Sequence, residues 1–127
     1  MKIKPLTIWF SLVSIILAII GLIFSIFGFG FFPSTILPKD LLLTWESAIY
    51  GSVLIGWGTT LFLIGRLAFK RNDSELLKIL LLGISVWLII EAIFSAYIGV
   101  YFNVGVDFAV LILFAIPIIL TVRKLKP

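Results

Sequence analysis

The sequence predicts an all-α integral membrane protein, a four-helix bundle that runs up-down-up-down with both termini on the cytoplasmic side. Apolar residues make up 62% of the 127-residue chain and charged residues only 13%. That composition lies far outside the range of water-exposed folds. The apolar residues fall into four long stretches, and nearly all basic residues lie on one side of them, which is the pattern of a multi-pass protein.

Residues 6–28 form the first predicted span. This mostly apolar run is long enough to cross a hydrocarbon core of about 30 Å as a helix. It continues into Phe29, Phe31 and Phe32 without a small-residue cleavage site, so we expect it to remain as a span rather than to be removed as a signal peptide.

Residues 29–44 follow as a predicted outer interfacial segment. Gly30, Pro33 and Pro38 interrupt its apolar side chains, so the segment is too broken to span the bilayer and too apolar for a solvated loop. Two readings stay open: the segment covers the mouth of a pocket, or it only returns the chain to the membrane.

The other three spans are expected at residues 45–66, 76–98 and 106–122, which gives a single membrane domain over residues 1–127. A polar turn separates the second and third spans, and Asn72 or Asp73 in it is expected to cap the third helix. The stretch from Gly99 to Gly105 is the only break between the third and fourth spans.

The basic residues set the predicted orientation. Only Lys39 lies on the outer side, while nine basic residues lie on the inner side, and such an excess marks the cytoplasmic face. The nine are Lys2, Lys4, Arg66, Lys70, Arg71, Lys78, Arg123, Lys124 and Lys126. We therefore expect a protein of the inner (plasma) membrane of a prokaryote, with the lipid bilayer as its main partner.

A seam of small residues follows the first span. Its members are spaced 3, 4, 3, 4 and 3 residues apart and so share one helix face; they are Ser11, Ser14, Ala18, Gly21, Ser25 and Gly28. In the second span, Gly51, Gly58 and Gly65 recur every seventh residue. The seam serves either packing inside the bundle or association with a second copy or another membrane protein.

Three carboxylates lie in the outer half of the spans: Glu46, Glu91 and Asp107. Glu91 is the deepest, and an ionised carboxylate there is costly unless it is paired, hydrated or protonated. We expect it to face the bundle interior, with Ser95 or a tyrosine as its hydrogen-bond partner.

A ligand-binding pocket open to the outside is one reading of these residues, and a cation, a proton or a small amphiphile could bind there. Its residues would be Glu46, Tyr50, Glu91, Ser95, Asn103 and Asp107. The other reading is structural: helix dipoles and water satisfy Glu46 and Asp107, and Glu91 is an isolated buried hydrogen bonder.

The residues that are missing restrict the chemistry. The chain has no cysteine and no histidine, so it lacks disulfides, the usual zinc, haem, iron–sulfur and copper ligands, and the commonest general base. It also lacks the common nucleotide-binding and hydrolase motifs. We therefore expect no metal, no cofactor and no enzymatic activity. The net charge of +4 is explained by topology, so no nucleic acid partner is expected.

The stretch from Tyr50 to Gly58, Tyr-Gly-Ser-Val-Leu-Ile-Gly-Trp-Gly, is preceded by Phe31-Phe32-Pro33. Together they resemble the small four-span bacterial proteins grouped as BphX-like and DoxX-like, whose second helix often opens with a Tyr-Gly pattern. The resemblance implies the four-span architecture and no settled biochemical role.

A lipid-modifying enzyme is one alternative, but it would need two convergent acids or an acid with a lysine, and the spacing offers no obvious pair. Two other functions remain. The first is a non-enzymatic accessory, scaffold or binding protein of the membrane, and the second is a small transporter or ligand-binding protein that uses Glu91 and the outer-half polar groups. A bundle cavity of roughly several hundred Å³ would favour the second, and a closed core would favour the first.

Overall fold

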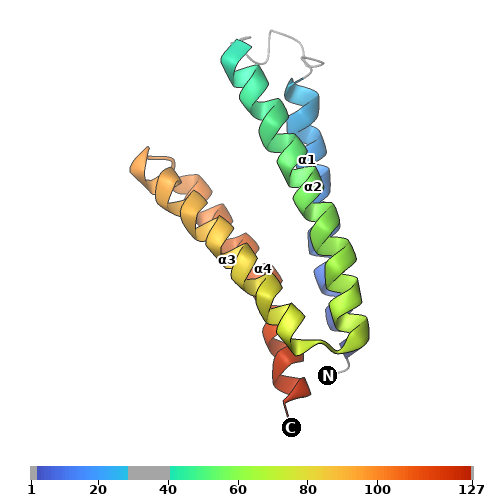
Figure 1. Ribbon diagram of the computed structural model, residues 1–127. Helices are drawn as coiled ribbons and strands as arrows, with labels where there is room; N and C mark the ends of the chain where they lie inside the picture. The colour runs from blue at the N-terminus through green and yellow to red at the C-terminus, as the bar shows by residue number, and fades with distance from the viewer. Residues whose placement is uncertain (1–2, 29–40, 127) are drawn as a thin grey trace. The chain divides into compact units, whose positions relative to one another are not determined.

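The structure of the protein, a computed structural model, describes residues 3–28 and 41–126, except the side chains of residues 27–28 and 41–45. This part of the chain forms four α-helices and contains no strand, which confirms the predicted all-α class. The helices are α1 (Ile3–Gly28), α2 (Leu41–Arg71), α3 (Ser74–Tyr97) and α4 (Tyr101–Leu125) (Figure 1).

Each of the four helices is long and apolar enough to cross a membrane. The apolar stretches contain 24 to 26 residues, and at about 1.5 Å per residue each exceeds a hydrocarbon core of about 30 Å. Predicted spans 6–28, 45–66 and 106–122 lie inside α1, α2 and α4, while span 76–98 extends one residue beyond α3 to its C-cap, Ile98. Within the predicted interfacial segment, residues 29–40 lie outside the described residues, and residues 41–44 begin α2.

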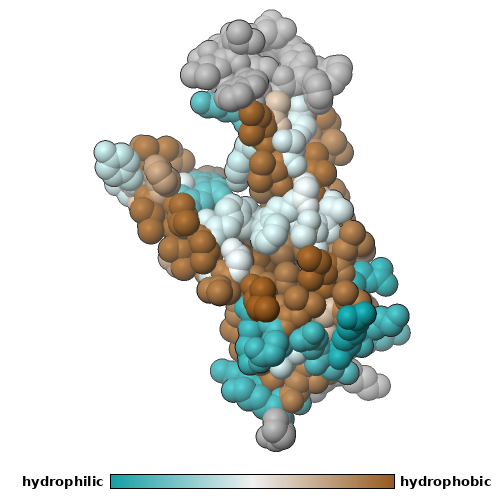
Figure 2. Space-filling view, in the orientation of Figure 1, coloured by the Kyte–Doolittle hydropathy of each residue, from teal (hydrophilic) through white to brown (hydrophobic). Residues whose placement is uncertain are grey.

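Large apolar side chains are exposed on all four helices, as the brown surfaces in Figure 2 show. Leu82 is 65% exposed, Ile93 is 62% exposed and Phe102 is 84% exposed. Water-soluble monomers rarely expose contiguous apolar surface on this scale. These surfaces are suited to hydrocarbon.

The chain divides into two compact units, one made of Met1–Val13 and Ile64–Pro127 and the other of Ser14–Leu63. In the unit Ser14–Leu63, α1 and α2 are antiparallel and their backbones approach each other at glycines. A Cβ atom placed on Gly21 would lie 2.7 Å from both the carbonyl oxygen of Gly51 and the nitrogen of Ile55. A Cβ on Gly58 would lie 2.8 Å from the nitrogen of Ala18. Only residues without a side chain allow so close an approach.

The α1 seam therefore packs against α2 of the same chain over its central part. Ser14, Ala18, Gly21 and Ser25 are the seam residues that lie beside Gly51 or Gly58. Ser14 is fully buried and Ser25 is 9% exposed. Gly51 and Gly58 of the seven-residue repeat thus form one interface with the seam of α1, whereas Gly65 faces the ring of Phe10.

In the unit of Met1–Val13 and Ile64–Pro127, a cluster of aromatic rings joins three helices. The Phe10 ring of α1 lies 5.4 Å from that of Phe69 in α2 and 5.3 Å from that of Phe114 in α4, measured between ring centroids. Phe10 and Phe114 are fully buried. The tilted and edge-on arrangements are those that aromatic pairs prefer.

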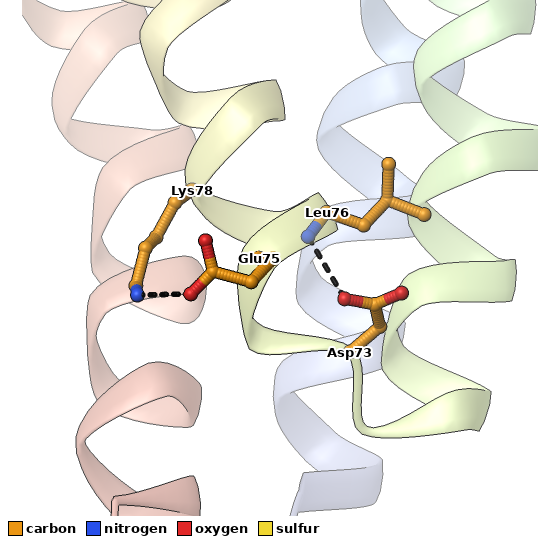
Figure 3. A network of polar contacts seen from close by, with 4 residues as sticks. All are labelled: Asp73, Glu75, Leu76 and Lys78. Carbon is orange, nitrogen blue, oxygen red and sulfur yellow. Dashed lines mark hydrogen bonds and ion pairs between the residues drawn. The ribbon is translucent and has the colours of Figure 1, made fainter.

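A tight turn joins α2 to α3 within this unit. Asn72 adopts a positive φ of 52°, which asparagine tolerates better than most residues. The Asp73 carboxylate then accepts a hydrogen bond from the Leu76 backbone N–H at 2.9 Å (Figure 3). Asp73 is the N-cap of α3. The sequence predicted either Asn72 or Asp73 for this role.

A second short turn joins α3 to α4, which lie side by side as an antiparallel hairpin (Figure 1). Gly99 has a φ of +82°, and the Val100 N–H donates to the Ser95 carbonyl at 2.8 Å. The predicted break at Gly99 is confirmed, but it is shorter than expected because α4 already begins at Tyr101. Gly105 lies inside the helix.

Candidate functional site

Helical spacing brings four of the predicted site residues together between α3 and α4. Glu91 and Ser95 are four residues apart on α3, and Asn103 and Asp107 are four residues apart on α4. Residues at this spacing share one helix face. Because the connection between the helices is only three residues long, the two pairs meet across the hairpin near its turn.

Asn103 is the centre of this polar cluster, by which we mean Glu91, Ser95, Asn103 and Asp107. Its Nδ2 atom donates to Ser95 Oγ at 2.9 Å, to Asp107 Oδ2 at 3.2 Å and to Glu91 Oε1 at 3.4 Å. A side-chain amide carries two hydrogens on this nitrogen, so three acceptors compete for two donors. The amide thereby links α3 to α4.

The polar cluster extends from a buried to a partly exposed environment. Asp107 is 3% exposed and Ser95 is 7% exposed, whereas Glu91 and Asn103 are half-buried. The cluster contains two carboxylates and no cationic side chain. Its oxygens are suited to accept hydrogen bonds or to contact a small cation, and none of its side chains is a strong nucleophile.

A small pocket adjoins Asp107 at the junction of α3 and α4. Its volume of ≈ 10 Å³ is enough for about one water molecule. The lining residues are Leu88, Ile89, Ala92, Asp107, Phe108 and Leu111. Asp107 is the only polar member of this lining, so the pocket offers one carboxylate in apolar surroundings and has no room for an amphiphile.

The two remaining predicted site residues, Glu46 and Tyr50, lie on α2 in the unit Ser14–Leu63. Glu46 is exposed. The Tyr50 ring makes an edge-on contact with Phe24 of α1, with 5.2 Å between ring centroids. The site that the structure assembles within one unit therefore has four members rather than six.

Sequence reasoning placed Asn103 among the candidates but missed its central role. The predicted partners of Glu91 were Ser95 or a tyrosine, and the hydrogen-bond donor that the structure places beside Glu91 Oε1 is Asn103 Nδ2. The fourth span was expected to start near Val106, which leaves Asn103 in a loop. A predicted fourth helix that began one turn earlier would have included Asn103. The four-residue spacing of Asn103 and Asp107 would then have placed both on one helix face.

Within the described residues, no three His, Cys, Asp or Glu side chains lie close enough together to hold a metal ion. The Trp57 indole nitrogen is buried and has no hydrogen-bond partner among these residues. The chain matches no family model, no curated protein and no solved structure.

Proposed function

We propose that the protein is a multi-pass protein of the inner membrane of a prokaryote, with four alternating spans and both termini in the cytoplasm. Four apolar helices support the spans, and the placement of nine basic residues on one side against Lys39 on the other supports the orientation. The resemblance of Tyr50 to Gly58 to BphX-like and DoxX-like proteins agrees with this architecture.

Cysteine labelling tests the proposed topology, because the chain has no native cysteine. Tyr101 begins α4 and is 72% exposed, whereas Lys124 lies in the last turn of α4 and is exposed. A membrane-impermeant maleimide should label Tyr101→Cys in intact cells and Lys124→Cys only after permeabilisation. The reverse pattern would contradict the orientation.

We further propose a non-catalytic role as an accessory or scaffold protein. The supporting observation is that hydroxyl groups along the helices donate to backbone carbonyls three or four residues earlier in their own helix, as Ser and Thr commonly do, rather than to a catalytic partner. These hydroxyls belong to Thr7, Ser52, Thr59, Thr60, Ser85 and Thr121. Since the α1 seam packs against α2, we assign it to packing within the chain rather than to self-association.

Photo-cross-linking in cells tests the accessory role. A photoreactive residue at Leu82 or Ile93, which are 65% and 62% exposed, should give a discrete heavier band from at least one of the two positions. The same residue at Leu80, which is 6% exposed, is the matched control and should give none. Cross-linking to lipid alone from both exposed positions would contradict a partner on this face.

The second candidate is a small transporter or ligand-binding protein that uses the polar cluster. It is favoured by the convergence of two carboxylates, a hydroxyl and an amide from two helices. Because the adjoining pocket has a volume of only ≈ 10 Å³, the ligand would be a proton or one small cation.

Thermal unfolding in sodium, potassium and choline chloride at equal ionic strength separates the two candidates. Cation binding predicts a Tm that is higher in one metal salt than in choline chloride, and Glu91→Gln should abolish that difference. Ser85→Ala should keep it, because the Ser85 hydroxyl bonds only to its own helix, at Leu81. Equal Tm values of the wild type in all three salts would contradict binding of these metal cations.

A further inference from the structure

One end of the unit formed by Met1–Val13 and Ile64–Pro127 carries a strong excess of positive charge. Figure 2 shows hydrophilic side chains gathered at the end where α2 and α4 finish and α3 starts. Eight described cationic residues lie in or next to the helix ends there, and all eight are exposed. They are Lys4, Arg66, Lys70, Arg71, Lys78, Arg123, Lys124 and Lys126.

The two carboxylates at this end have local roles. Asp73 caps α3 through Leu76, and Glu75 forms an ion pair of 2.6 Å with Lys78 (Figure 3). Arg71 and Arg123 have no carboxylate partner within the described part of the chain, so their charge is available to an external anion.

Apolar side chains exposed for contact with lipid lie one helical turn from these two arginines. Leu67 is 40% exposed and precedes Arg71 by four residues, and Ile119 is 39% exposed and precedes Arg123 by four residues. Residues four apart lie on the same helix face, about 6 Å apart along the axis. Each arginine therefore sits just beyond an apolar surface, at the level where the phosphate of a lipid would lie if its acyl chain packed on that surface.

We propose that Arg71 and Arg123, each with its neighbouring apolar face, bind anionic glycerophospholipids of the cytoplasmic leaflet. This inference rests on the membrane topology proposed above. The guanidinium group binds phosphate oxygens in a bidentate manner, and juxtamembrane cations are attracted to anionic leaflets. The exposed apolar residue beside each arginine favours a lipid over an acidic protein, because a protein segment would have to displace acyl chains from Leu67 and Ile119.

The test measures lipid preference with the full chain reconstituted into phosphatidylcholine bilayers. Spin-labelled phosphatidylglycerol and spin-labelled phosphatidylcholine are compared by the ratio of their association constants with the protein. One cation near an anionic membrane surface changes affinity by about fivefold. We therefore expect a severalfold preference for phosphatidylglycerol in the wild type and a severalfold loss of it in Arg71→Gln/Arg123→Gln. High salt should weaken the wild-type preference, because salt screens exposed charges.

The matched control is Glu75→Gln/Lys78→Gln, which removes an internally paired charge and its partner and keeps the net charge. It should retain the preference. Millimolar inorganic phosphate should leave the preference intact, and its loss would identify a free-anion site and overturn the lipid assignment. A wild-type ratio of one, or a ratio unchanged in Arg71→Gln/Arg123→Gln, would also overturn it. A chain that fails to enter the bilayer would instead contradict the proposed topology.

Discussion

At the scale of single residues, Asn103 has a larger structural role than either carboxylate of the polar cluster. Its one amide nitrogen connects Ser95 and Glu91 of α3 with Asp107 of its own helix. A buried acceptor that loses its donor incurs a desolvation cost, and Asp107 is 3% exposed. The stability of the α3–α4 hairpin should therefore depend on this side chain.

Asn103→Ala is expected to lower the free energy of unfolding by about 1–2 kcal/mol, the upper range for polar contacts between membrane helices. Thermal or denaturant unfolding in detergent measures the change. Ser85→Ala is the control, since its half-buried hydroxyl serves only its own helix and its loss should cost less than about 0.5 kcal/mol. Equal stability of Asn103→Ala and wild type would show that the amide bonds are not structurally important.

Two glycines of α2 offer an equally direct comparison. A Cβ on Gly51 would lie 2.5 Å from the Gly21 carbonyl oxygen, whereas a Cβ on Gly56 would meet nothing within 4 Å. Gly51→Ala should destabilise the α1–α2 contact by about 1–3 kcal/mol through overpacking. Gly56→Ala should be neutral or stabilise by up to about 1 kcal/mol, because alanine favours the helix. Similar unfolding curves for the two variants would contradict the close backbone approach.

At the scale of the elements, the turn between α2 and α3 depends on a single capping carboxylate. Asp73→Ala removes the bond to the Leu76 N–H and should cost about 0.5–2 kcal/mol. Asp73→Asn keeps a side-chain oxygen at the cap and should retain most of the stability. Hydrogen exchange at the first turn of α3 would locate the effect, and unchanged protection there in Asp73→Ala would exclude a capping role.

Much of each element could be predicted because apolar length and turn chemistry are local properties of the sequence. The four apolar stretches, the Asp73 cap and the break at Gly99 required no knowledge of neighbouring helices. The helix α4 begins five residues before the predicted fourth span, and the sequence did not indicate this extension because Gly105 and Asn103 are both weak helix formers. Packing against α3 and the hydrogen bonds of Asn103 supply the missing stabilisation, and these depend on residues distant in sequence. The spacing of small residues identified one face of α1 and one face of α2. It could not predict that these two faces contact each other at Gly51 and Gly58.

At the scale of the whole molecule, the exposed apolar side chains determine which solvent the chain can occupy. Side chains such as Leu82 and Phe94, each 65% exposed, would be in contact with water in a soluble protein, at a cost of about 25 cal/mol per Å² of apolar surface. The bilayer removes this cost.

The chain is therefore expected to remain with the membrane pellet after an alkaline carbonate wash and to be released by detergent alone. Partition into the detergent phase of a phase-separating detergent gives a second measurement. Recovery of monomeric chain in the aqueous phase would contradict the membrane assignment, whatever the orientation.

The close contact of α1 with α2 at Gly21, Gly51 and Gly58 has an evolutionary consequence. Glycine and alanine have no rotamer freedom to lose on association, so this interface forms at little entropic cost, and a larger side chain at Gly21, Gly51 or Gly58 would collide with the facing helix. On the opposite face, Ile16, Ile19 and Ile23 are exposed, and any apolar residue serves there equally well. Among descendants of this sequence, residue size should stay fixed on one side of α1 while the identities of the bulky aliphatic residues drift on the other.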